Sequence, residues 1–97
     1  MSFKRRWVYK LKTTKKFDTQ YKKLSAKDKE LTFGVMQKLL KGEILDEKHK
    51  DHKLKGEFQA YRECHIKPNL LLIYQKQDDI LTLTCVNVGS HSKLFKS

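Results

Sequence analysis

Four stretches of the chain have the apolar patterns of β-strands. In "RRWVYKLK", Trp7, Tyr9 and Leu11 alternate with polar and basic residues, as in a half-buried strand. After Gly56, the stretches "FQAYRECHI", "NLLLIYQK" and "DILTLTCVNV" are bounded by "KP" and by paired aspartates, which are typical of turns. We therefore expect one strand near the N-terminus and three consecutive strands in the second half.

Between these regions the apolar spacing lengthens to that of helices. Phe17, Tyr21 and Leu24 recur at i, i+4 and i+7, so one face of a short helix is apolar and the other carries lysines. Thr14 is placed to cap the N-terminus of this helix with its side-chain oxygen. This segment therefore predicts a first, short helix.

A second helix is expected directly after the first. It begins at Ser25 as N-cap, with Asp28 in its first turn, and its apolar residues continue to Leu40. Gly42 is placed to end it. Because a glycine inside a helix costs up to about 1 kcal/mol relative to alanine, Gly34 predicts close packing against a neighbour.

The order of these segments predicts a single α+β domain over residues 1–97. One strand, two helices and three strands (β-α-α-β-β-β) give an antiparallel sheet of about four strands with a two-helix hairpin packed on one face. The polar segment "GEILDEKHKDHKLKG", residues 42–56, is longer than most connections, and long ordered loops are often functional. The sequence contains no internal repeat or linker.

The net charge points to an anionic partner. The chain has 22 Lys and Arg against 11 Asp and Glu, a formal net charge of +11. An excess of this size repels itself in the folded state, which favours a nucleic acid as partner and an acidic protein as second choice. Lysine-rich surfaces can also serve solubility alone. No stretch predicts a membrane span or a secretory signal, so we expect a cytoplasmic protein with reduced, buried cysteines.

The four histidines are the candidate catalytic residues. His49 and His52 lie in the polar segment, His65 near the end of a strand and His91 in the C-terminal tail. His52, His65 and His91 flank the predicted strands, so the fold could gather them on the helix-free face. Imidazoles among lysines suit metal-free phosphodiester cleavage, in which one group takes the ribose 2′-hydroxyl proton and another protonates the leaving oxygen. Each histidine also has an ordinary structural interpretation as a hydrogen-bonded loop or strand-end residue.

A metal site is the alternative for two of these histidines. His49 and His52 have the spacing H-x-x-H, and Cys64 and Cys85 could add sulfur ligands. Structural zinc sites usually use paired ligands at both ends, and neither cysteine has a close partner in the sequence. We therefore expect no metal and no other cofactor.

Three segments of the sequence together resemble a known toxin family. "KDHKLKG" at 50–56, "YRECHIKPNLLLIY" at 61–74 and "GSHSKLF" at 89–95 are similar to the signature segments of the YafQ branch of the RelE/ParE superfamily. Its members are bacterial type II toxins that cut mRNA in the ribosomal A site and are held inactive by an antitoxin. The resemblance covers essentially the whole chain and implies a RelE-like fold.

The resemblance implies roles for individual residues. His52, His65 and His91 match the catalytic histidines, with His91 as the general acid and His52 as a base or phosphate contact. Phe95 matches an aromatic that contacts an mRNA base, consistent with stacking on an unpaired nucleotide. The tail would thus bring an acid and a stacking surface to the end of the last strand.

Two positions depart from the family pattern. Asn69 follows the proline, where the branch commonly has an acid, and an amide cannot transfer a proton. Asn87 stands where some members have an arginine, so the guanidinium fork that best clamps phosphate is missing there. Both remain candidate RNA contacts. The residues that could supply the cation instead are Lys53, Lys55, Lys67 and Arg62.

These features predict a toxin that acts as a ribosome-dependent mRNA endoribonuclease. Its expected partners are a cognate antitoxin, mRNA and the ribosome with its rRNA, with operator DNA bound only through the antitoxin complex. The alternative is a binding toxin of the same fold without catalysis, for example an inhibitor of DNA gyrase. The three histidines favour the nuclease, because a pure binder has no chemical reason to assemble them.

Overall fold

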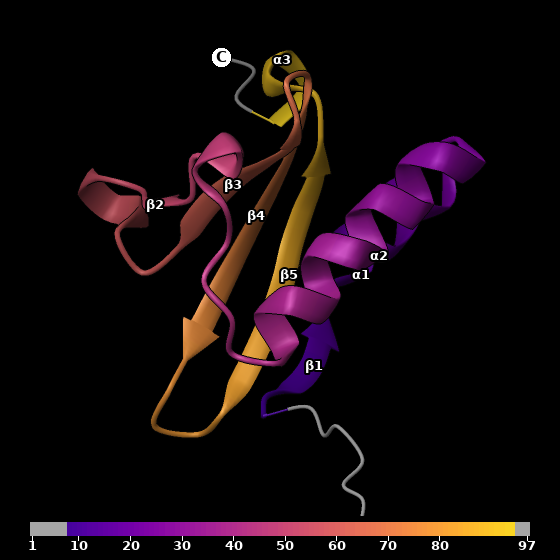
Figure 1. Ribbon diagram of the computed structural model, residues 1–97. Helices are drawn as coiled ribbons and strands as arrows, with labels where there is room; N and C mark the ends of the chain where they lie inside the picture. Colours follow the sequence, from indigo (N-terminus) through magenta and orange to yellow (C-terminus); the bar gives the residue numbers. More distant parts are fainter. Residues whose placement is uncertain (1–7, 95–97) are drawn as a thin grey trace, which may run out of the picture.

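The protein is a five-stranded sheet with two helices across one face (Figure 1). The computed structural model describes residues 8–94. The strands are β1 (Lys10–Thr13), β2 (His52–Lys53), β3 (Arg62–Lys67), β4 (Leu70–Gln77) and β5 (Thr82–Gly89). They lie in the order β1-β5-β4-β3-β2. The predicted α+β class is confirmed.

The helices α1 (Lys15–Lys22) and α2 (Ala26–Leu40) form the expected hairpin between β1 and β2. Thr14 Oγ accepts a hydrogen bond from Phe17 N at 3.0 Å, and Ser25 Oγ accepts one from Asp28 N at 3.1 Å, so both predicted N-caps are confirmed. Gly42 follows the end of α2 with φ 79°, as a C-terminal glycine should.

The close packing expected at Gly34 is wrong. No heavy atom outside its own helix backbone and chain neighbours lies within 4 Å of a Cβ built at this residue. The glycine therefore weakens α2 without a packing reason.

The sheet differs from the prediction at both of its edges. β1 runs parallel to β5, with Lys10 opposite Thr82, whereas the pairs β2–β3, β3–β4 and β4–β5 are antiparallel. At the other edge the polar segment contributes β2, a fifth strand of only two residues. The same segment contains the short 3-10 helix η1 (Glu47–His49). A second one, η2 (Gly56–Phe58), follows β2, and the short helix α3 (His91–Leu94) follows β5.

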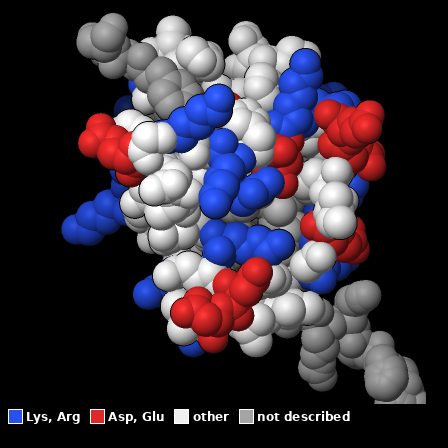
Figure 2. All heavy atoms as spheres, turned by 90° about the vertical axis from the view of Figure 1, so that its left-hand side faces the viewer, with Lys and Arg blue, Asp and Glu red and all other residues white. Residues whose placement is uncertain are grey.

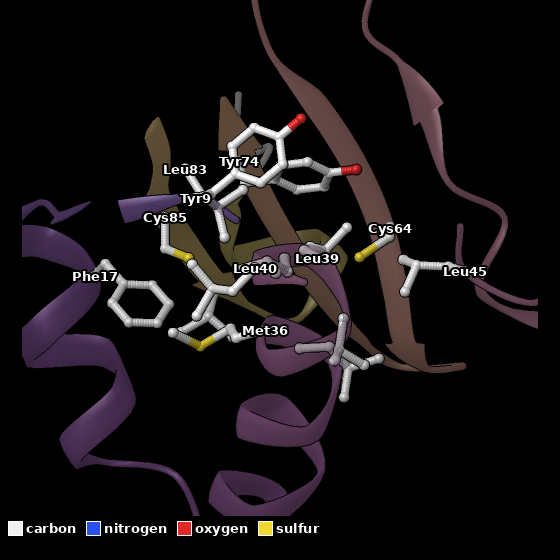
Figure 3. Close-up of a cluster of buried hydrophobic side chains, with 14 of the residues drawn as sticks. Tyr9, Phe17, Met36, Leu39, Leu40, Leu45, Cys64, Tyr74, Leu83 and Cys85 are labelled. Carbon is white, nitrogen blue, oxygen red and sulfur yellow. The ribbon is translucent and has the colours of Figure 1, made fainter. Parts of the chain in front are cut away.

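The main core lies between the helices and the sheet (Figure 3). Phe17 of α1 and Leu39 of α2 pack there with Leu72 and Tyr74 of β4. Both cysteines are free and fully buried in this core, so the expectation of buried, unpaired thiols is confirmed. Burial raises the pKa of the Cys85 thiol to about 12 and also raises that of Cys64. Among residues 8–94, no helix is long and apolar enough to span a membrane.

Candidate active site

The helix-free face of the sheet carries two of the candidate histidines, His52 and His65, in two cross-strand rows. Leu71 and Ile73 of β4 are buried but stand outside the main core cluster, so their side chains belong to the face opposite the helices. The first row runs across four strands through His52, Glu63, Ile73 and Asn87. The second runs through His65, Leu71 and Gly89.

His91 follows this second row closely along the chain. Gly89 ends β5, and His91 is the first, exposed residue of α3. Ser90 Oγ accepts a hydrogen bond from Lys93 N at 3.3 Å and so supports this short helix. The sheet therefore places His52 and His65 on one face, and His91 lies two residues beyond the end of β5. Phe95 lies outside the described residues.

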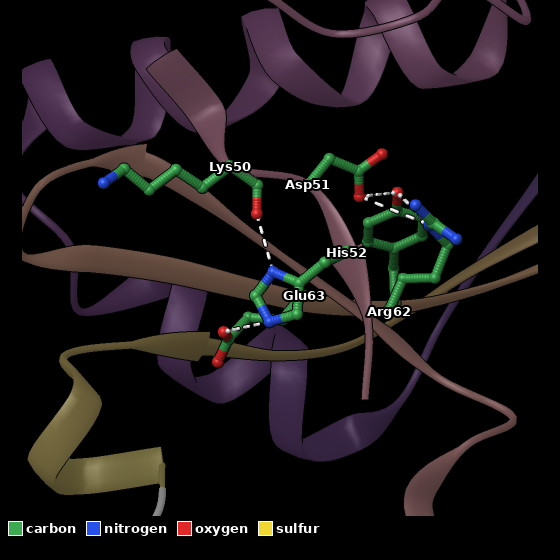
Figure 4. Close-up of polar contacts among 6 residues, drawn as sticks. Lys50, Asp51, His52, Arg62 and Glu63 are labelled. Carbon is green, nitrogen blue, oxygen red and sulfur yellow. Dashed lines mark hydrogen bonds and ion pairs between the residues drawn. The ribbon is translucent and has the colours of Figure 1, made fainter. Parts of the chain in front are cut away.

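The side chain of His52 is held at both ring nitrogens (Figure 4). Nδ1 lies 2.7 Å from the carbonyl oxygen of Lys50, and Nε2 lies 3.2 Å from Oε1 of Glu63. A carbonyl and a carboxylate both accept hydrogen bonds, so the two contacts form together only when the ring carries both protons. Since the His52 side chain is 51% exposed, an incoming substrate can reach it.

The backbone before His52 is adapted to this contact. Lys50 has φ 44°, in the left-handed region that non-glycine residues rarely adopt. Its carbonyl is the one that binds Nδ1, only two residues away in the sequence. Local backbone strain of this kind is typical of positions that the surrounding structure must fix.

Glu63 is a site residue that our sequence reasoning missed. It is 7% exposed and its carboxylate faces His52. An acidic residue inside a predicted strand, two positions from His65 and therefore on the same face, was the signal available in the sequence.

A second polar cluster lies on the opposite, helix-covered side and anchors the start of β2. The hydroxyl of Tyr74 donates to Asp51 Oδ1 at 2.6 Å, and Arg62 Nε donates to that same oxygen at 3.3 Å. Burial and the bond to Asp51 raise the pKa of Tyr74. Burial lowers the pKa of Arg62, but its bonds to Asp51 and Tyr74 outweigh this effect and raise it overall.

The candidate cations are divided between several parts of the molecule. Arg62 forms an ion pair with Asp51. Lys53 is the cross-strand neighbour of Arg62, so Lys53 and Arg62 both belong to the face away from His52. Lys55 is exposed just before η2. Lys67 Nζ pairs with Asp28 of α2 at 2.8 Å and lines a cavity of about 440 Å³ together with Asn69.

Figure 2 shows Lys and Arg side chains gathered on the face that carries the β2 edge, with Asp and Glu mostly toward its periphery. The exposed lysines of residues 48–55 are Lys48, Lys50, Lys53 and Lys55. This surface therefore presents positive charge beside the His52–Glu63 pair.

His49 has a structural contact rather than a metal-binding arrangement. It is buried, and its Nδ1 donates to the backbone carbonyl of His65 at 2.7 Å. Within residues 8–94, no group of three or more His, Cys, Asp or Glu could hold a metal ion. The contact joins η1 to β3 at the point where the register of β3 shifts.

Comparison with known proteins agrees with this architecture. The family described as "Bacterial toxin of type II toxin-antitoxin system, YafQ" matches residues 9–96. The chain belongs to this YafQ family. The "mRNA interferase toxin YafQ" of Escherichia coli (strain K12) is 38% identical over 47 residues, which cover 48% of this chain and 49% of that protein. The chain thus spans about half the length of the curated YafQ relatives it matches.

Two solved structures extend the likeness over most of the chain. A metal-bound toxin from Helicobacter pylori is 41% identical, with a TM-score of 0.77 over 90% of this chain and 99% of that one. The Escherichia coli DinJ-YafQ toxin-antitoxin complex gives a TM-score of 0.80 at 25% identity, over 91% of this chain and 98% of that one. The fold expected from the YafQ resemblance is therefore confirmed.

Proposed function

We propose that this YafQ-family protein is an mRNA endoribonuclease that acts on the ribosome and is neutralised in the cytoplasm by a cognate antitoxin. The observation that carries this proposal is the His52–Glu63 contact on the helix-free face, beside the sheet row that runs from His65 to Gly89, two residues before His91. The names of the YafQ relative and of the DinJ-YafQ complex support mRNA as substrate and an antitoxin as partner. Operator DNA would be bound only by the antitoxin complex.

The reaction uses the 2′-hydroxyl of the RNA as nucleophile. Its oxygen attacks the adjacent phosphorus, its proton passes to a base, and the bond to the 5′-oxygen breaks as that oxygen receives a proton from an acid. The products are a 2′,3′-cyclic phosphate and a 5′-hydroxyl. Because the attacking group is the 2′-hydroxyl, DNA cannot react in this way.

The His52–Glu63 pair is suited to act as the general base of this reaction. Nε2 has a single lone pair in the ring plane, so to accept the 2′-hydroxyl proton it must be unprotonated, and the hydroxyl must take the place beside it that Glu63 Oε1 occupies at 3.2 Å. The hydrogen bond from Nδ1 to Lys50 fixes the ring orientation during the transfer. Glu63 stabilises the imidazolium that forms.

His91 is the proposed acid and His65 a third imidazole that contacts the phosphate. Lys53, Lys55 and the amides Asn69 and Asn87 are proposed contacts to the RNA, with Phe95 stacking on a base. Lys67 and Arg62 first have to leave their carboxylate partners, or act as fixed positive charges beside them. The ribosome supplies much of the positioning of the mRNA, which can lower the barrier by several kcal/mol.

The test is cleavage of a defined mRNA in a purified translation system, with 5′ ends mapped by primer extension. We expect wild-type cuts within A-site codons and a loss of about 10²- to 10⁴-fold in His91→Ala and Glu63→Gln, as general acid–base groups contribute. Ile80→Ala, which changes a side chain 57% exposed at the β4–β5 turn, is the matched control and should cut normally. Translation arrest without cuts would favour the non-catalytic toxin, and gyrase inhibition would be measured next.

A further inference from the structure

A small apolar cavity lies on the same sheet face as the candidate active site. Its volume is about 240 Å³, and Ile73 and Asn87 line it. These two residues are also the last members of the row that begins with His52 and Glu63. The cavity is therefore continuous with the proposed catalytic surface and lies farther along the same row.

Two aromatic rings from the loop after β2 form the opposite wall of this cavity. Phe58 is 52% exposed and Tyr61 is half-buried. Among residues 8–94, the one stacked aromatic pair is Phe17 with Tyr21, so neither Phe58 nor Tyr61 stacks on another described ring. Neither ring is therefore engaged in stacking with another described ring, and a flat ligand could stack on one of them.

Besides the hydroxyl of Tyr61, the cavity has a polar group in the amide of Asn87. Its Oδ1 is buried without a hydrogen-bond partner among the described residues. A buried polar atom left unpaired costs about 1–3 kcal/mol, so a ligand that pairs with this amide would recover part of that energy. Since no hydrogen bond fixes the amide, rotation of the side chain can present its oxygen or its NH₂ group.

The short helix α3 forms a third side of the cavity. Leu94 of α3 lines the cavity and packs over β5, because a Cβ at Gly89 would lie 3.4 Å from Leu94 Cδ2. The cavity thus lies between the β2–β3 loop and the helix that begins with His91. Leu54, which follows β2, is another lining residue.

We propose that this cavity binds one unpaired nucleobase of the RNA, stacked on Phe58 or Tyr61 and read at its edge by Asn87. The proposal rests on the proposed RNA-cleaving function and adds a base-selective subsite to it. The volume is smaller than most whole-ligand pockets and suits a single base whose ribose and phosphate stay outside. Unpaired bases are commonly recognised by such stacking together with hydrogen bonds to their edges.

The first test needs no cleavage. Full-length protein with labelled Leu and Ile methyl groups is titrated with each of the four nucleoside 5′-monophosphates, and with ribose 5-phosphate as a probe without a base. We expect saturable shifts at Leu54 and Ile73 with at least one nucleotide, none with ribose 5-phosphate, and none at the remote Ile80. Equal shifts with ribose 5-phosphate, or no shift at Ile73, would overturn the proposal.

Variants then test which lining residues of the cavity contribute to nucleotide binding. Phe58→Ala should weaken nucleotide binding about 5-fold or more, the usual effect of losing one stacking partner, whereas Ile80→Ala should not. Asn87→Leu keeps a side chain of similar size and should reduce the difference in affinity between the four bases. If Phe58→Ala instead weakened only the complex with the cognate antitoxin, the occupant would be a protein side chain and the proposal would be wrong.

Cleavage maps separate this proposal from the proposed function. In the translation assay, Asn87→Leu should redistribute cuts among codons. Wild-type cuts with an unchanged distribution in Asn87→Leu and Phe58→Ala would overturn the base subsite while the nuclease stands. Nucleotide binding in the cavity without any cuts would leave the subsite in place and overturn the nuclease.

Discussion

Lys50 shows how one residue can hold another in place. Its left-handed backbone, φ 44°, turns its carbonyl to the His52 ring, and this conformation costs a non-glycine residue about 1–2 kcal/mol. We predict that Lys50→Gly is more stable than Lys50→Ala by about 1 kcal/mol, because both remove the ammonium group and only glycine removes the strain. Urea unfolding of the two variants measures the difference, and equal midpoints would contradict the assignment of strain.

The buried thiols give a pH dependence of stability. The pKa of Cys85 is raised from 9.0 to about 12 by burial, so its thiol stays protonated in the folded chain at pH values where the unfolded chain ionises. The stabilisation is therefore complete below pH 9 and is lost as the pH rises from 9 toward 12. We predict that the free energy of unfolding falls by roughly 1.4 kcal/mol per pH unit per thiol in this window.

Urea unfolding with a reducing agent, at pH 8 and pH 10.5, tests this slope. Cys85→Ala should start from a lower stability and lose less of it between the two pH values than the wild type. Equal losses in both proteins would show that the Cys85 thiol does not titrate as its burial requires.

The site residues differ in how far the sequence could predict them. The alternation of a strand places Glu63 and His65 on one face and Arg62 on the other, so the separation of Arg62 from the histidines could have been derived from the sequence alone. The contact between His52 and Glu63 could not, because it depends on the cross-strand register of a two-residue strand. The left-handed Lys50 has no sequence signal, since lysine does not favour that conformation.

Helices and strands were predictable to the extent that their signals are local. The caps at Thr14 and Ser25 depend on a few neighbouring residues and were confirmed. The parallel pairing of β1 with β5 joins segments more than 60 residues apart, and an alternating edge strand has the same pattern in either direction. β2 is too short to show a period at all.

A glycine inside α2 and a glycine just after it should respond to alanine in opposite ways. Gly34 is helical with open space around a Cβ, so Gly34→Ala should stabilise the protein by up to about 1 kcal/mol. Gly42 has φ 79°, where an L-residue is strained, so Gly42→Ala should destabilise it by about 1 kcal/mol. Thermal unfolding of the two variants beside the wild type measures the sign of each change in stability. A loss of stability in Gly34→Ala would reveal a contact that the structure does not show.

The charge of the whole molecule predicts a strong dependence on salt. With a net charge of +11, binding to RNA should weaken as salt rises, because each cation–phosphate contact releases counterions. We predict that replacing both Lys53 and Lys55 by Gln lowers the slope of log K against log[salt] by roughly 1.4, at about 0.7 per contact. Replacing both Lys38 and Lys41, at the end of α2, should leave the slope unchanged.

Fluorescence anisotropy with a short 2′-O-methyl RNA measures these slopes, because an RNA without free 2′-hydroxyls cannot be cut by the proposed mechanism. An equal change in both double variants would mean that the charge acts only through the average field of the protein. Unequal changes of the expected size would place RNA phosphates beside β2.

The position of β5 in the sheet determines when the protein can complete its fold during synthesis. β5 is the last strand in the sequence but lies between β1 and β4, so neither the sheet nor the row ending at Asn87 can be completed until residues 82–89 have been synthesised. Non-local pairing of this kind also delays folding. A protein proposed to attack translating ribosomes would thus lack its active surface until β5 has been synthesised and has paired with β1 and β4.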